Sequence, residues 1–468
     1  MTPGANDLCV FAVKRGSIER RIDPHFYLPM FMVVVNRIKE GDYAPLGDIA
    51  KFSNEYTDYS EFDCGEFKYL EISGVSLGTN KYKTTTVDVN NAPSRARMKT
   101  QKGDIVISLT RPHRGAIAII EEDGIIASTG FSVIRSTTDA VDKSWLLYCL
   151  LSNSSLMQML QRSSGGNYPA IIEDELKRIY VPIISLEKQK SMTREIEAVL
   201  KRIEENRIKA NNLLRERRNI VLEKTNVSIS SKQQSFTYAV LCRKLLDRID
   251  ADYYSPKFSQ FRDSIEHCKY PASSIESISD RIISGFAAGK QDQADDLPDD
   301  QRIAQLRPFS ITPEGELSFE TKKYVPKDRL KSEDYCQKGE VIFNNTNSPD
   351  LVGKTTVFDQ DVLCATSNHM TRITVKDGVN PYYVAAFFNV LLSIGYWKLL
   401  CTNFNNQAGV NIETLKKVRI PLPDISVQNE IAAEIMRRRS QANQLRKEAA
   451  KEWTKAKAQF ERELLGES

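Results

Sequence analysis

The chain has 468 residues, which at roughly 150 residues per domain predicts about three folded units. Its 65 Lys and Arg residues nearly balance 61 Asp and Glu residues, so a uniformly basic nucleic-acid coat is excluded and any site for a polyanion must be local. A hydrophobic fraction of 41% excludes disorder throughout, and since the sequence offers neither a long apolar run nor a secretory leader, we expect a cytoplasmic protein.

Residues 1–185 carry short β-branched and aromatic runs separated by Gly, Pro and Asn, a pattern typical of strands and turns. The stretch is long enough to bury a core of its own, so we assign it to a first globular domain. The predicted strands are 67–72, 104–109 and 116–120, followed by a short helix near 145–160 and a Pro-marked strand at 178–183.

Residues 186–224 are predicted to form a long polar helix, because apolar side chains recur every seven residues along one narrow seam. Charged and amide side chains cover the other faces, so this helix needs a partner helix to bury its seam. The Ser- and Gln-rich segment 225–240 that follows is predicted to be a linker. The seam and a neighbouring line of the same period consist of Ile196, Ile203 and Ala210, and of Val199, Asn206, Leu213 and Ile220.

Residues 241–425 repeat this plan as a second globular domain, with strands predicted at 340–343, 355–358 and 418–422 and a helix near 382–400. Residues 426–468 are predicted to form a second long helix whose small seam residues let another helix approach closely. We expect the two long helices to pack antiparallel. The second seam consists of Ile435, Ala442, Ala449 and Ala456, with Ile431 and Leu445 on the adjoining line.

The two halves of the chain are copies of one unit. Residues 101–106 (QKGDIV) match 337–342 (QKGEVI) at a shift of 236, and Leu-Lys, Pro and Gln within 176–189 return within 415–428 at a shift of 239. The order of the matches is kept while the shift rises, as loop insertions between two copies would produce. We therefore predict an α+β fold of two tandem pseudo-symmetric domains, each followed by a long helix, with the helices packed as an antiparallel coiled coil.

The sequence does not contain a convincing catalytic arrangement. The eight cysteines stand singly and the four histidines lack metal-ligand spacing, so we expect neither a metal nor a cofactor. Segment 348–356 ends like a phosphate-binding loop but has Ser348 where the first glycine is required. Asp63, Glu66 and Lys68 resemble a nuclease set, yet the second copy has no counterpart. We predict a non-enzyme.

Polar and basic loops near strand ends are the candidate contacts with a polyanion. Basic side chains in the first copy suit phosphate neutralisation and guanine recognition, and Asn side chains in the second copy suit adenine. For each residue the plain interpretation, a turn or a solvated surface, stays open. The candidates are Arg95, Arg97, Lys99, Lys102, Arg111, His113, Arg114, Asn167 and Tyr168 in the first copy, and Asn344, Asn345, Asn347, Lys354, Asn405, Asn406 and Gln407 in the second.

Two domains joined by paired helices would be held a fixed distance apart by those helices. A helix of about 37 residues is roughly 55 Å long, and one turn of B-DNA is ~34–36 Å. We therefore expect two half-sites separated by about one turn or slightly more. Because the loops of the two copies differ, the target should be asymmetric.

Two pairs of motifs recur in the two copies: Gly103–Val106 and Gly339–Ile342, together with Leu176–Pro182 followed by Gln189, and Leu415–Pro423 followed by Gln428. Through these motifs the chain resembles the DNA specificity subunits of type I restriction-modification systems, from about residue 20 to residue 465. One departure is that the first copy lacks a counterpart of Pro423 before its helix.

The resemblance implies a non-catalytic subunit of a phage-defence system, with two target recognition domains that bind double-stranded DNA. It also implies assembly with two adenine-methylating modification subunits, placed against the spacer helices, and with motor-nuclease restriction subunits. No base contact follows from it, since recognition domains in this family vary widely. Three alternatives stay open: the specificity subunit of a methylation-only or other defence system, a coiled-coil scaffold that binds proteins, and a single-chain nuclease or methyltransferase.

Overall fold

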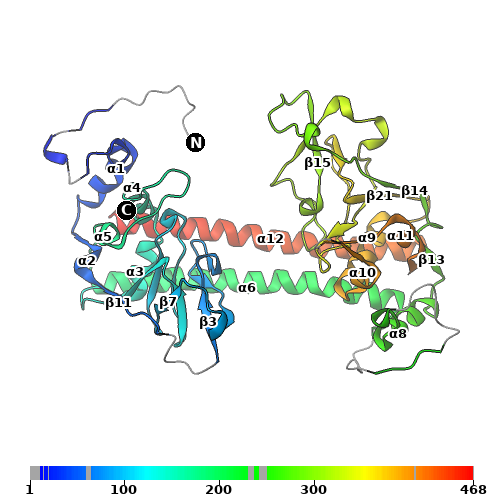
Figure 1. Cartoon of the computed structure of the whole chain (residues 1–468), viewed down its shortest axis with the longest axis horizontal. Coiled ribbons are helices and arrows are strands. Elements are labelled where there is room, and N and C mark those ends of the chain that lie inside the picture. The colour runs from blue at the N-terminus through cyan, green and yellow to red at the C-terminus, as the bar shows by residue number, and fades with distance from the viewer. Residues whose placement is uncertain are drawn as a thin grey trace. The chain divides into compact units, whose positions relative to one another are not determined.

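The computed structural model describes residues 11–13, 15–18, 21–58, 65–229, 237–241, 250–404 and 407–466. The chain divides into two compact units, the first made of residues 1–205 and 448–468 and the second of residues 206–447. Two uninterrupted helices contribute to both units: α6 (Leu186–Thr225), green in Figure 1, and α12 (Ile425–Leu464), red in Figure 1.

Unit 1 is built on two four-stranded sheets that share a core. Strand β8 (Ile105–Ser108) is fully buried because each of its two faces packs into a different hydrophobic cluster. Ile105 and Ile107 pack with the helices around Trp145, whereas Val106 points the other way, toward Leu70. One sheet has the order β2 (Ala50–Ser53), β11 (Phe131–Thr137), β8 and β9 (Ile117–Ile119), and the other β6 (Thr85–Asp88), β3 (Glu66–Leu70), β10 (Ile125–Ser128) and β7 (Ala96–Lys99).

The helix predicted near 145–160 is two helices in the structure. It divides after Leu150 because the hydroxyl of Ser152 accepts a hydrogen bond from the backbone N–H of Ser155 and starts a new helix. The remaining elements of unit 1 are α1 (Pro29–Ile38), α2 (Leu46–Ile49), α3 (Lys143–Leu150), α4 (Asn153–Gln161), α5 (Glu173–Leu176), the paired strands β1 (Tyr43–Pro45) and β12 (Tyr180–Pro182), and the pair β4 (Val75–Ser76) and β5 (Lys81–Tyr82).

Unit 2 repeats this plan with a larger aromatic core. Trp397 packs edge-on against Phe343, with ring centroids 4.7 Å apart, and against Phe388 at 5.1 Å. The helix predicted near 382–400 is again divided, here at Gly395, which has a φ of 79°. The sheets have the orders β14 (Ser279–Ser284), β21 (Met370–Val375), β17 (Val341–Asn344), β19 (Thr355–Val357) and β16 (Tyr324–Pro326), β15 (Arg302–Leu306), β20 (Cys364–Thr366).

Smaller elements complete unit 2. The pair β13 (Ala272–Ser274) and β24 (Arg419–Pro421) leads into α12, as β1 and β12 lead into α6. The others are α7 (Ala251–Tyr254), α8 (Pro256–Glu266), α9 (Pro381–Ser393), α10 (Tyr396–Leu400), α11 (Ile412–Lys417) and the three-stranded sheet β18 (Thr346–Asn347), β23 (Gln407–Gly409), β22 (Thr402–Phe404).

The sequence repeat is also a repeat of hydrogen bonds. Gly103 N–H donates to the carbonyl of Ile120 at 2.7 Å, and Gly339 N–H donates to that of Phe358 at 2.8 Å. Each glycine has a φ near 90°, at 89° and 88°, which explains why glycine occupies both positions. The two units therefore share their local geometry as well as their order of elements.

The predicted antiparallel pairing of the long helices is confirmed. In unit 1 the beginning of α6 meets the end of α12, where Lys188 pairs with Glu463 at 2.5 Å. In unit 2 the end of α6 meets the beginning of α12, where Lys224 pairs with Glu430 at 3.1 Å. Exposed ion pairs of this kind are worth little, so the seam provides most of the stabilisation. Its most deeply buried members are Ile196, Ala210, Ile431, Ala442 and Ala449.

In the part of the chain that the structure describes, every helix is too short or too polar to cross a membrane.

Candidate nucleic-acid interface

Three loops meet at the carboxyl end of β8 in unit 1. Leu109 N–H donates to the carbonyl of Gly130 at 2.8 Å, and the carbonyl of Leu109 accepts from Ile171 N–H at 2.9 Å. Arg111 N–H donates to Pro169 at 2.7 Å. We call residues 109–115, 129–130 and 164–170 the unit 1 loop cluster. It joins a segment that follows the central strand to one lying more than fifty residues later.

The seven basic candidates of the first copy do not form a single patch. The carbonyl of Arg95 accepts a hydrogen bond from Thr129 N–H at 2.8 Å, so Arg95 borders the unit 1 loop cluster. Strand β7 runs antiparallel to β10, which places Lys99 away from this end. Lys102 precedes β8 and therefore lies at the opposite end of that strand, while exposed Arg97 lies on β7 itself. The structure thus brings Arg95, Arg111, His113, Arg114, Asn167 and Tyr168 to one end of the unit.

Arg111 has an unusual backbone conformation, with φ 48° and ψ 49° in the left-handed region. Among the described residues the other non-glycine residues with positive φ are Asn80 and Asn226, and asparagine tolerates this region far better than arginine does. The guanidinium of Arg111 lies over the ring of Tyr168, 4.1 Å from its centroid, and its Nη2 donates to the carbonyl of Asn167 at 2.9 Å. Tyr168 is 71% exposed.

His113 is a structural neighbour of this pair. Its Nδ1 is buried without a hydrogen-bond partner among the described atoms. Burial lowers the pKa of His113 from its usual 6.5, and the positive charges of Arg114 and Arg111 lower it further. The ring is therefore neutral at pH 7, and the positive charge of this turn is carried by Arg111 and by Arg114, which is exposed.

Unit 2 has an equivalent cluster at the carboxyl end of β17. Asn345 N–H donates to the carbonyl of His369 at 3.1 Å, and the carbonyl of Asn345 accepts from Val410 N–H at 2.9 Å, repeating both hydrogen bonds of Leu109. We call residues 345–348, 368–369, 402–404 and 407–409 the unit 2 loop cluster. Here the sheet β18-β23-β22 replaces the irregular loops of unit 1.

Three candidates of the second copy are buried inside unit 2. The amide of Asn344 donates to the carbonyl of Leu351 at 3.1 Å, and that of Asn345 donates to Thr371 at 2.9 Å. Lys354 Nζ donates to the carbonyl of Pro308 at 2.8 Å and to that of Ile311. These side chains hold the loops together, so they do not form part of the interface that we propose.

Two candidates of the second copy are accessible. Gln407 is exposed, and Asn347 is half-buried, with its side-chain oxygen accepting from Ser348 N–H at 2.8 Å. Asn405 and Asn406 lie outside the described residues. Asn368 and His369, which are absent from the candidates predicted from the sequence, are exposed and extend the cluster. The repeat offers a signal for them: Ala127 of the first copy corresponds to Ala365 of the second at a shift of 238. Gly130 and His369 follow these alanines by three and four residues and accept equivalent hydrogen bonds.

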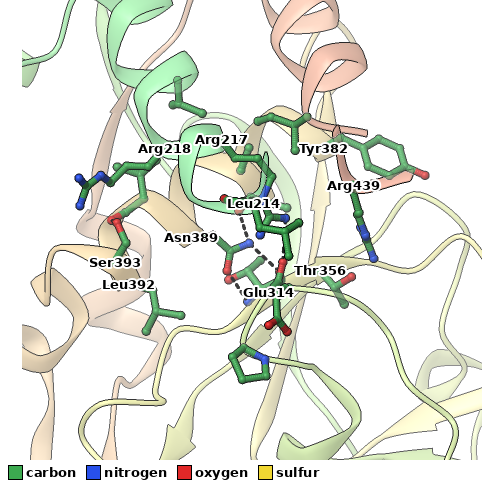
Figure 2. Close-up of a pocket in the computed structure, with 18 of the residues that line it drawn as sticks. Leu214, Arg217, Arg218, Glu314, Thr356, Tyr382, Asn389, Leu392, Ser393 and Arg439 are labelled. Atoms are coloured by element: carbon green, nitrogen blue, oxygen red, sulfur yellow. Dashed lines mark hydrogen bonds between the residues drawn. The ribbon is translucent and has the colours of Figure 1, made fainter. Parts of the chain in front are cut away.

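A pocket of about 630 Å³ lies in unit 2 between the helices and the turn 312–316 (Figure 2). Arg217 of α6 donates through Nη1 to the carbonyl of Glu314 at 2.9 Å. Arg439 of α12 donates through Nε to Glu316 at 2.8 Å. Burial lowers the pKa of Arg217, and the charge of Arg439 lowers it further. These polar groups tie the turn to both helices, so the pocket lies where the turn packs against α6 and α12 within unit 2.

The segments that resembled enzyme motifs have structural roles. A Cβ on Gly353 would lie 2.1 Å from Cδ1 of Trp397, so this glycine of segment 348–356 is required by packing. Lys68 pairs with Glu122 at 2.5 Å on the surface, and Asp63 lies outside the described residues. Among the described residues, no three His, Cys, Asp or Glu side chains are placed to hold a metal ion.

Comparisons with known proteins point to one family. The model of the family described as Type I restriction modification DNA specificity domain matches residues 39–213 and 311–452, more than half of the chain. The specificity subunit of the type I restriction enzyme MjaVIII from Methanocaldococcus jannaschii is 29% identical over 157 residues, which are 31% of this chain and 36% of that protein. The HindI specificity subunit from Haemophilus influenzae is 26% identical over 152 residues, 31% of this chain and 32% of that protein.

These matches span about a third of the length of each curated relative, at 36% and 32%. A chain in a solved structure of a type I R-M system is similar over 91% of this chain and 96% of that one, with 18% identity and a TM-score of 0.48.

Proposed function

Because the chain belongs to the family of type I restriction-modification DNA specificity domains, we propose that it is the subunit that reads DNA for its enzyme. It binds a bipartite, asymmetric target in double-stranded DNA. The methylation of adenine and the cleavage of unmethylated DNA are carried out by partner subunits in the cytoplasm. The chain itself is not an enzyme.

One observation carries this proposal: the two loop clusters occupy equivalent places and differ in chemistry. Leu109 and Asn345 make the same two backbone hydrogen bonds. The segment after Leu109 then presents Arg111 and Arg114, whereas the segment after Asn345 presents Asn347 beside Gln407. Arginine favours guanine and amide side chains favour adenine. Two such clusters in one chain would read two different half-sites.

The long helices support the spacer role. α6 and α12 each run for 40 residues without a break. At 1.5 Å per residue each is roughly 60 Å long. We infer that the length of the helix pair sets the number of unread base pairs between the half-sites.

A groove in unit 1 supports a docking role for the helices. It has a volume of about 390 Å³ and is mostly apolar. Its lining includes Tyr148, Leu156, Ile196, Trp453 and Phe460, which come from α3, α4, α6 and α12. We infer that one modification subunit docks here with an apolar side chain as its anchor. A second modification subunit would dock on the helices in unit 2, and restriction subunits would join this assembly.

An exchange of domains tests the proposal. Residues 20–180 are replaced by the same domain of another family member, and the chimera is purified with its modification subunits. DNA affinity is then measured on a panel of gapped duplexes at several salt concentrations. We expect one half-site to change, the other half-site and the gap to stay, and affinity to fall with salt. A complex without salt-dependent DNA affinity would instead support the protein scaffold, and turnover by the purified chain alone would support an enzyme.

A further inference from the structure

We propose that Arg111 reads a guanine in the first half-site, and that the ring of Tyr168 is the platform that holds its guanidinium in place. This inference rests on the proposed function, and it assigns one base to one side chain. It is carried by the backbone of Arg111, by the contacts of its side chain and by the exposure of Tyr168.

The backbone conformation of Arg111 is held by its surroundings. A left-handed conformation is unfavourable for arginine, and the following Pro112 adds a steric restriction on the residue before it. The loop fixes this conformation through Arg111 N–H, which donates to Pro169 at 2.7 Å, and through the bridge between Thr110 and Ala170. Pro112 itself is buried. Strained non-glycine residues of this kind persist where the surrounding structure enforces them, and they cluster at binding sites.

The side chain of Arg111 is positioned but not neutralised. One of its donors, on Nη2, is used by the carbonyl of Asn167 at 2.9 Å, and its Cζ lies 4.1 Å from the ring centroid of Tyr168. No carboxylate of the described residues forms an ion pair with it. Because Nη2 carries two N–H groups and uses one of them, one pair of parallel donors, either Nε with Nη2 or Nη1 with Nη2, remains for a ligand.

Guanine matches these donors better than a phosphate does. The N–H groups of a guanidinium lie in one plane, which the ring of Tyr168 and the carbonyl of Asn167 hold in place here, and guanine presents O6 and N7 as two acceptors in one plane. A phosphate can be approached from any side, so it requires neither the ring nor the strained backbone. Arg114, three residues later, is exposed without an aromatic contact among the described residues, and we assign it to phosphate.

The substitutions are chosen so that the loop still folds. Arg111→Gly removes the side chain and accepts the positive φ. Tyr168→Phe keeps the ring, Tyr168→Ala removes it, and Arg114→Ala is the matched control. Each variant is co-expressed with its modification subunits, and the methylated motif is mapped. Binding of each purified complex is also measured on the cognate duplex and on a duplex in which 7-deazaguanine, which lacks N7, replaces the guanine.

We expect Arg111→Gly to make one guanine position of the first half-site degenerate and to leave the second half-site and the gap unchanged. Discrimination at that position should fall on the order of tenfold to a hundredfold. The 7-deazaguanine duplex should weaken the wild-type complex and leave the Arg111→Gly complex unaffected. Tyr168→Phe should keep the motif, Tyr168→Ala should loosen the same position, and Arg114→Ala should weaken all sequences alike.

The inference is overturned if Arg111→Gly keeps every base of the motif, or if it weakens all sequences alike as Arg114→Ala does. It is also overturned if 7-deazaguanine affects the variant as strongly as the wild type. A wild-type complex without any gapped methylated motif would contradict the proposed function itself, and this outcome is seen before a variant is compared.

Discussion

Two buried glutamines fasten the long helices to the two units, and their substitution gives a quantitative prediction. Gln189 lies in the first turn of α6 and is fully buried. Its side-chain oxygen accepts from Asp142 N–H at 2.7 Å, and its amide donates to the carbonyls of Ile184 at 2.8 Å and Ala140 at 2.9 Å. Gln428 occupies the equivalent place in α12. Substitution by leucine keeps the approximate volume and removes all of these hydrogen bonds.

The expected costs differ between the two sites. A hydrogen bond of this kind contributes about 1 kcal/mol, and its loss leaves buried groups unpaired, so Gln189→Leu should cost about 3 kcal/mol. Gln428 has good contacts with Asn380 N–H at 2.8 Å and with the carbonyl of Pro423 at 2.7 Å, but its third contact, to Gly378, is 3.5 Å long. Gln428→Leu should therefore cost about 2 kcal/mol.

Hydrogen exchange followed by mass spectrometry measures both costs in the full chain. Gln189→Leu should accelerate exchange in α3 on the order of a hundredfold, and Gln428→Leu should accelerate exchange in α9 by less. Gln101→Leu and Gln337→Leu are the matched controls. Gln101 and Gln337 also occupy equivalent places in the two copies, but both are exposed. Unchanged exchange in α3, or a larger effect of Gln428→Leu than of Gln189→Leu, would refute the reasoning.

Three further predictions follow from single features of the structure. Gly353→Ala should lower the free energy of unfolding of unit 2 by more than about 3 kcal/mol in urea, because its Cβ would overlap Trp397. Gly103→Ala, where the φ is 89° and the space is open, should cost only about 1 kcal/mol. Equal costs for the two variants would contradict the packing argument. The pKa of His113 is lower in the folded protein than its usual value of 6.5, which applies in the unfolded chain. Its contribution to stability should therefore be present above pH 6.5 and be lost as the pH falls below that value. An NMR titration midpoint above 6.5 would contradict this prediction. Inserting seven residues into each of α6 and α12 keeps the seam in register and lengthens the helix pair by about 10 Å. The gap in the target should therefore grow by about three base pairs, while both half-site sequences stay the same. A changed half-site with an unchanged gap would contradict the spacer role.

Much of the fold was predictable because its signals are periodic or repeated. The helices predicted over 186–224 and 426–468 are observed as Leu186–Thr225 and Ile425–Leu464, since a seven-residue seam is a local pattern that survives tertiary packing. The predicted strand at 104–109 is observed as Ile105–Ser108. The divisions of the short helices were missed because a cap at Ser152 and a left-handed Gly395 each override a continuous apolar pattern.

The candidate interface was less predictable, because exposure is decided by contacts between distant segments. Asn344, Asn345 and Lys354 stand in a polar loop of the sequence, yet their side chains are buried by partners elsewhere in unit 2. Asn345 binds Thr371 of β21, and Lys354 binds the carbonyl of Pro308. In the same way the sequence offers Arg111 and Tyr168 as separate candidates. Only the folded loops place one over the other, at 4.1 Å.

The most direct test of the central claim is a map of methylated adenines. The chain is co-expressed with the modification subunits proposed as its partners, in a host that lacks adenine methylation, and the genome is sequenced for modified bases. We predict one two-part motif with unequal halves and a fixed gap. A complex that forms without methylating DNA, or one that methylates a continuous motif, would contradict the claim that this chain reads two half-sites.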